Sequence, residues 1–185
     1  DFGTVTIGTR AHRTFPVVNT GEFSATLDIV STPALQLGAP FTLDGGTCVT
    51  STPVEPDGGT CTVTIAYAPT DAGLATDTVV LVYSDGLANK TATRGLAGTG
   101  ATPAMIVLSD GGTYDYGPVT IGLTAAQTFA VINTGDTAAT LGTVTTGGLL
   151  LDPPFANDTW SCGSGSLLAA DGGVAEHAHV GFQRG

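Results

Sequence analysis

An internal repeat constrains this sequence more than any other feature. Residues 2–27 read FGTVTIGTRAHRTFPVVNTGEFSATL, and residues 116–141 read YGPVTIGLTAAQTFAVINTGDTAATL. The two windows align without a gap at an offset of 114, and 15 of the 26 aligned positions are identical. A repeat of this length indicates two copies of one structural unit. The repeat therefore says more about the fold of the two units than about their function.

Short runs of alternating polar and apolar residues predict β-strands within each copy. The clearest run is 60–67, in which Cys61, Val63, Ile65 and Tyr67 share one face. Gly (27) and Pro (10) are frequent, which suits tight turns and disfavours helices. Further strands are expected at 4–7, 14–18, 25–30, 76–83 and 90–96, with Phe15, Val17, Leu27 and Ile29 inward and Phe41 in the core. Such a series of short strands indicates a β-sandwich.

The offset also sets the domain organisation. We predict an all-β chain of two tandem Ig-like β-sandwich domains, residues 1–100 and 101–185, with a linker at 98–103. The second copy begins with an extra strand at 104–108, to which the first has no equivalent. It contains no counterpart of residues 70–100, so we expect the second domain to lack its last two strands.

An incomplete sandwich leaves backbone groups unpaired along an edge. We expect this assembly edge in the last strand of the second copy, at Val174, Ala178, Val180 and Phe182. Three explanations stay open. The sequence is an excerpt of a longer repeat array, or a neighbouring chain supplies the missing strands, or the second copy is frayed.

Charge and hydropathy exclude two classes of partner. The formal net charge is −11, with only five Lys and Arg residues, and nucleic acid binding requires basic side chains. No nucleic acid partner is therefore expected. No window of about 18 consecutive apolar residues occurs, so insertion into a membrane is not expected either. The acidity is more simply explained as a means of keeping the protein soluble.

The motifs of the first copy, taken in order, resemble a known family. They are an early F-G-x-V-x-I-G, then F-x-V-x-N-T-G, a central Phe, a Cys pair, C-T-V-T-I-A-Y-A-P-T-D-A-G and a closing L-A-G-T-G. This pattern is similar to Ig-like domains of the abnormal-spindle/Hydin type, in particular the bacterial repeats called choice-of-anchor D, which are related to major sperm protein. The resemblance covers residues 2–100 and most of 101–182. It implies tandem sandwiches on secreted or surface-anchored proteins, without catalytic residues.

The second copy departs from that pattern near its end. It has Phe182-Gln183-Arg184 where the first has Tyr67-Ala68-Pro69, and Ala175 lies near the position that corresponds to Cys61. The cysteines are also distributed unequally, with two in the first copy and one in the second. Cys48 and Cys61 bracket one loop, and we predict a disulfide between them, the alternative being two reduced buried thiols. Cys162 has no partner in its own copy, so we predict a free thiol, the alternative being an intermolecular link.

No catalytic or cofactor site is predicted. His177 and His179 share a face of a strand, but no third metal ligand accompanies them, so no metal is expected. Four Asp-Gly-Gly segments, which begin at Asp44, Asp57, Asp110 and Asp171, are interpreted as turns rather than calcium sites. His12 has two arginines and no acid beside it in the sequence.

The prediction is therefore a non-catalytic, extracellular or cell-surface structural repeat protein, such as a spacer, fibre or filament subunit. Its expected partners are copies of itself or neighbouring repeats of a longer chain, and strand donation between chains would join them. The alternative is an adhesin or a carbohydrate-binding accessory module of a secreted protein.

Overall fold

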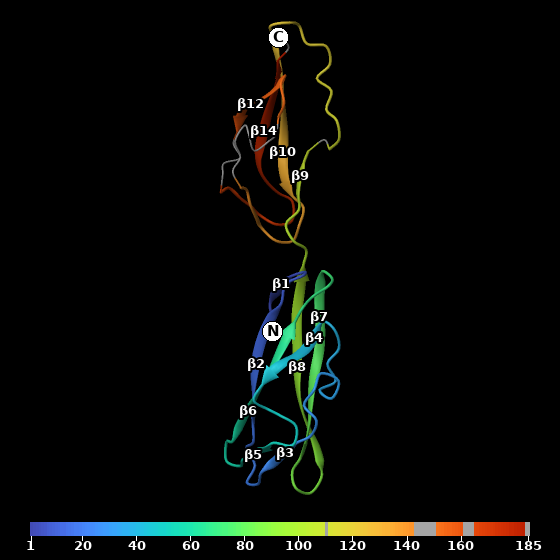
Figure 1. The fold of residues 1–185 in the computed structure, drawn as a ribbon, viewed down its shortest axis with the longest axis vertical. Helices are drawn as coiled ribbons and strands as arrows, with labels where there is room; N and C mark the ends of the chain where they lie inside the picture. The colour runs from blue at the N-terminus through green and yellow to red at the C-terminus, as the bar shows by residue number, and fades with distance from the viewer. Residues whose placement is uncertain (110, 143–150, 161–164, 184–185) are drawn as a thin grey trace. The chain divides into compact units, whose positions relative to one another are not determined.

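The computed structural model describes residues 1–109, 111–142, 151–160 and 165–183, and it divides the chain into two compact units. The first unit is Asp1–Ala101 and the second is Thr102–Gly185 (Figure 1). All the regular structure in the described residues is β-strand, so the predicted all-β class is confirmed.

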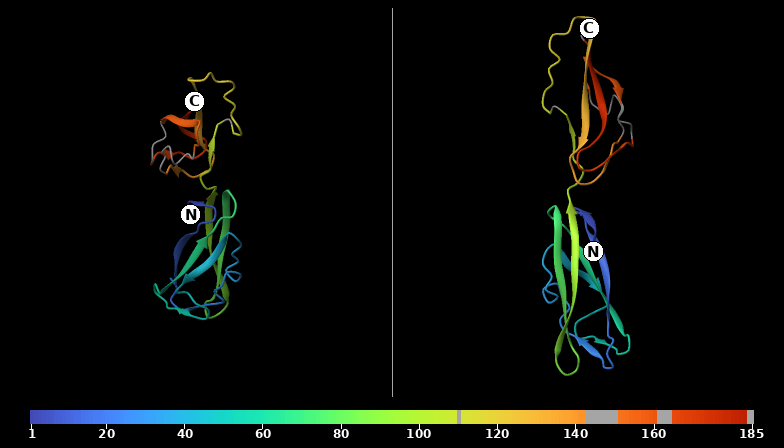
Figure 2. Two further views of the ribbon diagram at one scale, coloured as in Figure 1. Left: turned by 45° about the horizontal axis from the view of Figure 1, so that its top comes forward. Right: turned by 180° about the vertical axis from the view of Figure 1, so that it is seen from behind.

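Two sheets form the first unit, and both can be followed in Figures 1 and 2. The larger sheet has the order β1 (Thr4–Thr6), β8 (Asn89–Ala101), β7 (Gly73–Ser84), β3 (Ala25–Leu27) and β5 (Pro53–Val54). The smaller sheet has the order β2 (Ala11–Val18), β6 (Thr60–Tyr67) and β4 (Phe41–Gly46). Strand β1 runs parallel to β8, whereas the other pairs are antiparallel. Strand β2 is therefore an edge of the smaller sheet.

The core of the first unit follows the predicted alternation along β6. Cys61, Val63, Ile65 and Tyr67 are all less than 9% exposed, as the period of two requires. Tyr67 stacks on Phe41 with ring centroids 4.9 Å apart, and Phe2 lies 5.6 Å from each of those rings. These three rings, defined here as the aromatic triad, fill one end of the sandwich.

Two details of the predicted strands are wrong. Residues 98–101 belong to β8 rather than to a linker, because their glycines permit close packing and not flexibility. A Cβ atom at Gly98 would lie 2.7 Å from the Tyr67 ring. Ile29 is 58% exposed and not inward, because β3 ends at Leu27.

The second unit repeats part of this architecture. One sheet has the order β12 (Phe155–Trp160), β14 (Gly173–Gln183), β10 (Thr124–Asn133) and β9 (Ile106–Leu108). A two-stranded sheet pairs β11 (Ala139–Thr140) with β13 (Leu167–Leu168). By the offset of 114, β10, β11, β12 and β13 correspond to β2, β3, β4 and β5, and β14 corresponds to β6. The described residues of this unit include no counterpart of β7 or β8.

A β-bulge explains why the offset grows from 114 to 115 along β14. Val131 pairs with Glu176, but the next residue, Ile132, pairs with Val174. Ala175 is thus the one extra residue, and a bulge absorbs it without changing the pairing on either side. Ala175 is also the residue that stands at the position of Cys61, so the insertion coincides with the loss of the second cysteine.

The predicted assembly edge is wrong for the strand that was chosen. Ala178, Val180 and Phe182 pair with β10 on one side of β14 and with β12 on the other. Val174 pairs with Ile132 of β10. Residues 178–182 of β14 therefore lie inside the sheet, because residues 155–160 form a strand that the sequence did not predict, whereas Val174 pairs with β10 alone.

Candidate functional site

The candidate site lies in the first unit, where β2 ends and the turn Asn19-Thr20-Gly21 begins. The Asn19 side chain holds this turn: its Oδ1 accepts from the Gly21 N–H at 3.0 Å, and its Nδ2 donates to the carbonyls of Phe23 and Val54, both at 2.8 Å. An Asn in this role mimics backbone hydrogen bonding and fixes how the chain leaves the strand. The turn forms one wall of an open groove.

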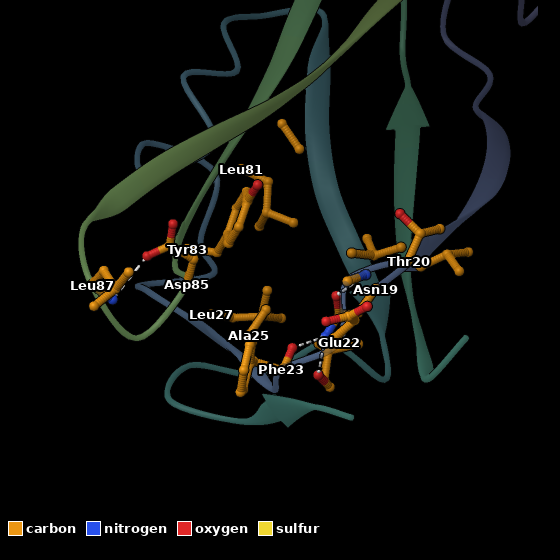
Figure 3. A pocket seen from close by; sticks show the side chains of 15 residues that line it. Asn19, Thr20, Glu22, Phe23, Ala25, Leu27, Leu81, Tyr83, Asp85 and Leu87 are labelled. Atoms are coloured by element: carbon orange, nitrogen blue, oxygen red, sulfur yellow. Dashed lines mark hydrogen bonds between the residues drawn. The ribbon is translucent and has the colours of Figure 1, made fainter. Parts of the chain in front are cut away.

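The opposite wall of the groove comes from the larger sheet. Leu81 and Tyr83 of β7 face the Asn19 turn across the opening, with Leu27 at the base (Figure 3). The cavity volume is about 460 Å³. At the rim, Phe23 is 78% exposed and Leu87 is 96% exposed. A groove with one apolar wall and exposed apolar side chains at its rim is suited to binding an apolar group.

A second cavity of about 240 Å³ continues along β2 towards Phe15. It shares Val17, Val18, Leu81 and Ala92 with the larger one, so the two form one groove between β2 and the β7–β8 pair. The guanidinium of Arg94 lies 5.2 Å from the centre of the Phe15 ring and partly covers it. Phe15, predicted to be inward, is half-buried and packs against the core.

The acidic groups at the rim have structural explanations. The backbone N–H groups of Ala88 and Leu87 donate to Asp85 at 2.7 and 2.9 Å, and these bonds hold the pKa of that carboxyl below its usual value. Asp85 thereby fixes the turn between β7 and β8. Glu22 lines the opposite side of the groove, on the Asn19 turn (Figure 3). The described residues contain no group of three or more His, Cys, Asp or Glu side chains that could hold a metal ion.

An acid beside His12 is one pairing that the sequence did not reveal. The Nδ1 of His12 lies 2.8 Å from a carboxylate oxygen of Asp44, and Arg10 lies 3.7 Å from the other oxygen. Both side chains of the His12–Asp44 pair are more than a third exposed, so this is a polar contact on the surface of the sandwich. Asp44 lies in strand β4, whereas Asp57 and Asp171 have the positive φ angles of turn residues.

The cysteine predictions separate into two outcomes. A disulfide joins Cys48 and Cys61, with a Cα–Cα distance of 5.0 Å, and both residues are buried. Cys162, predicted to be a free thiol, lies outside the described residues, as do the side chains of His177 and His179. No helix in the part of the chain that the structure describes is long and apolar enough to cross a membrane.

These features define the class of the protein as an all-β protein with Ig-like sandwich units. Residues 1–98 match the HYDIN/CFA65/VesB-like Ig-like domain family, so the chain belongs to this family. This membership indicates a non-catalytic structural domain.

Two solved structures are similar to the chain. One is a protein of unknown function from Porphyromonas gingivalis W83, at 15% identity and a TM-score of 0.41, covering 97% of this chain and 77% of the other. The second is the VesB protease of Vibrio cholerae, at 17% identity and a TM-score of 0.39. That match covers 52% of this chain and 29% of the protease. No curated protein matches the chain.

Sequence reasoning missed the groove itself. Two signals pointed to it: the extra strand before the second copy, which the first copy lacks, and Pro16 within β2. Proline has no N–H to donate to a neighbouring strand, so within sheets it marks an edge.

Proposed function

We propose that this chain is a non-catalytic structural repeat of an extracellular or cell-surface protein, and that it assembles by adding strands between neighbouring repeats or copies. One observation carries the proposal: among the described residues, each unit shows a surface that strands cover in its sister unit. The triad of the first unit is 5% exposed or less, whereas Phe155, the counterpart of Phe41, is 40% exposed. Apolar surface of this kind, next to unpaired strand edges, favours association by β-strand addition.

The compartment is inferred from covalent chemistry and charge. The buried disulfide fits an oxidising environment, where such bonds persist. The net charge of −11 keeps a protein with few charged residues soluble outside the cell.

Association of the purified full chain tests the proposal. Light scattering after size-exclusion chromatography, followed by electron microscopy, is expected to show oligomers or filaments that grow with concentration. Phe155→Ser is expected to weaken association, whereas Leu74→Ser, at a residue that is 72% exposed on β7, serves as the matched control. Monodisperse monomers at all concentrations would overturn assembly between copies.

A binding module is the second candidate, and the groove favours it. Phe23 and Tyr83 offer aromatic rings beside the acidic Glu22 and Asp85. An adhesin or a carbohydrate-binding accessory module uses rings and polar groups in this way. Specific glycans bound by the monomer on an array, and lost in Phe23→Ser, would promote this function over the structural one.

A further inference from the structure

The second unit shows what covers the edge of its own copy of β2. Strand β9 runs antiparallel to β10 and pairs Leu108, Val107 and Ile106 with Val131, Ile132 and Asn133. Backbone hydrogen bonds extend the pairing at both ends: Thr134 N–H donates to the Met105 carbonyl, and Ser109 N–H donates to the Ala130 carbonyl, each at 2.8 Å. Met105 N–H also donates to the side-chain oxygen of Asn133 at 3.0 Å.

The corresponding edge in the first unit is bare. By the offset of 114, Val131, Ile132 and Asn133 correspond to Val17, Val18 and Asn19, and these three residues line the groove. All of the first unit is described, and within it β2 pairs with β6 only. The groove therefore lies where β9 lies in the second unit.

Burial at equivalent positions supports the same conclusion. Asn133 is 0% exposed and Val131 is 6% exposed, although the described residues of their unit include no counterpart of the β7–β8 pair. Asn19 and Val17 are only half-buried, although their unit has that pair. The difference follows from β9 and the residues that lead into it, because those cover Asn133.

Two equivalent glycines differ in the same way. A Cβ atom on Gly135 would collide with the carbonyl of Pro103, where the chain enters β9. On Gly21 the nearest atom is the Asn19 side-chain oxygen at 3.2 Å, and the space that Pro103 would occupy is open. Gly21 thus leaves room for a chain segment at the place that Pro103 takes in the second unit.

We propose that the groove between β2 and the β7–β8 pair is a strand-acceptor site for a β9-type edge strand from a neighbouring repeat unit. The strand pairs antiparallel with Val17, Val18 and Asn19. Its apolar side chains at the positions of Ile106 and Leu108 enter the groove towards Leu81 and Tyr83, because residues paired across two strands share a face. The proposal specifies the acceptor site for the assembly proposed above, on which it rests.

The source of the strand follows from the connection within this chain. Strand β9 begins five residues after β8 ends at Ala101, so the segment that leaves one sandwich becomes the edge strand of the next. A neighbouring repeat can present its own segment to the first unit in the same manner. Residues 102–109 carry no charged side chain, which suits a groove with Glu22 and Asp85 at its rim.

Pro16 modifies the expected pairing. Its counterpart Ala130 donates its N–H to the Ser109 hydroxyl at 2.9 Å, and proline cannot make this bond. The Pro16 carbonyl stays available to accept, as the Ala130 carbonyl does. The added strand therefore pairs most strongly with Val18 and with the Thr20 N–H.

The test adds the missing segment to the full chain. A copy of residues 102–114 is placed directly before Asp1, which corresponds to Asp115, so that the spacing of the second unit is reproduced. Hydrogen exchange at the Val18 and Thr20 amides is then measured with and without the extension. We expect about tenfold or greater slowing at both amides, because a backbone N–H paired in a ladder exchanges only after opening. Unchanged exchange at both amides overturns the site.

Two variants separate strand pairing from general stabilisation. Gly21→Ala in the extended chain is expected to abolish the slowing, because its Cβ takes the space of the incoming Pro103 equivalent. Exchange at the same amides in the unextended Gly21→Ala chain is the reference, because the new Cβ lies 3.2 Å from the Asn19 side-chain oxygen and shifts the turn by itself. An extension whose Ile106 and Leu108 equivalents are Asp should give no slowing, and slowing that persists in both variants overturns the proposed geometry.

The outcomes also separate this proposal from the assembly proposal. Protection in the extended chain while the wild-type chain stays monomeric supports the acceptor site and removes assembly between copies. Association of the wild-type chain without protection in the extended chain does the reverse. Protection of Val18 and Thr20 in the wild-type chain alone at high concentration identifies a second copy as the donor, and this overturns the neighbouring-repeat source.

Discussion

Each unit of this chain packs three aromatic rings together, but the rings of the two units differ in how far they are buried. In the first, the centroids of Phe2, Phe41 and Tyr67 lie 4.9–5.6 Å apart, and all three rings are 5% exposed or less. Their counterparts in the second are Tyr116, Phe155 and Phe182, which lie 5.2–5.9 Å apart. Phe155 is nevertheless 40% exposed.

The repeat thus determines which rings meet, and the covering strands determine how much water reaches them. In the first unit β8 closes over the triad, with Gly98 against the Tyr67 ring. The second unit has no such cover among its described strands. The burial is reversed at the ends of β2 and β10. Strand β9 pairs with β10 and Asn133 is buried, whereas β2 pairs only with β6 and Asn19 is half-buried.

Truncating equivalent rings should give the largest difference between the units. Phe41→Ala is expected to cost about 3–5 kcal/mol of unfolding free energy, because it leaves a cavity in a closed core. Phe155→Ala is expected to cost about 1–2 kcal/mol, because that ring already contacts water. Denaturant titration measures both: fluorescence of Trp160, the only tryptophan, reports on the second unit, and hydrogen exchange reports on the first.

Equal losses of unfolding free energy for Phe41→Ala and Phe155→Ala would contradict the difference in burial between the two units. They would mean that the rings Tyr116, Phe155 and Phe182 are covered in solution. Association between copies provides one such cover, so the titration is repeated at two protein concentrations. A cost at Phe155 that grows with concentration would sharpen the assembly proposal instead.

Loss of the disulfide should affect the first unit alone. Replacing Cys48 and Cys61 together by Ala is expected to cost about 3 kcal/mol, because the bond closes a short loop in the unfolded chain. The transition followed at Trp160 should not change. Intact mass after alkylation, with and without reductant, checks the bond, and three reactive thiols in unreduced native protein would contradict it.

The sequence predicted the parts of the fold that depend on local pattern. Alternation along 60–67 gave the buried face of β6, because a strand has a period of two whatever surrounds it. The bracketing of one loop by Cys48 and Cys61 similarly indicated their bond. The prediction of a linker is wrong at 98–101 for a physical reason. Glycine occurs both in flexible linkers and where the backbone packs closely, and only the position of the Tyr67 ring against Gly98 shows that close packing applies.

The candidate site could not be derived in the same way. The unmatched strand at 104–108 was visible in the sequence, but its pairing partner was not. Placing it beside β10 required the register of Val131, Ile132 and Asn133. For the same reason, the sequence predicts an edge at β14: the strand at 155–160 that flanks it has no clear alternation of polar and apolar residues.

Replacing the buried Asn133 should lower the free energy of unfolding more than replacing its half-buried counterpart, Asn19. The amide of Asn133 donates to the carbonyls of Thr137, Leu168 and Ala169, and Asn133→Ala would leave these groups unsatisfied. The expected cost is about 2–3 kcal/mol, against about 1 kcal/mol for Asn19→Ala, where water can replace the lost bonds. Denaturant titration of both variants checks the ranking, and a larger cost at Asn19 would show that its groove is already occupied in solution.

The smallest expected effect is on the contact between Thr102 and Asp136, which lies just before β9 in the chain. The Thr102 N–H and hydroxyl both donate to one carboxylate oxygen of Asp136 at 2.7 Å, and these two bonds lower the pKa of Asp136. A lowered folded pKa means that the contact stabilises above the ordinary Asp value of about 3.9 and is lost as the pH falls through the lower folded value. The chemical shift of the Thr102 amide, followed from pH 7 to pH 2, measures that midpoint.

A midpoint below the ordinary value is expected in the wild-type chain. Thr102→Ala should raise it only in part, because the backbone N–H, which contributes most, remains. The amide shift should not titrate in Asp136→Asn. Since this contact anchors the segment that leads into β9, protection of the Ile132 amide, meaning its exchange rate relative to the intrinsic rate at each pH, should fall together with the titration. A midpoint at or above the ordinary value would mean that the hydrogen bonds of its ladder alone hold β9 in place.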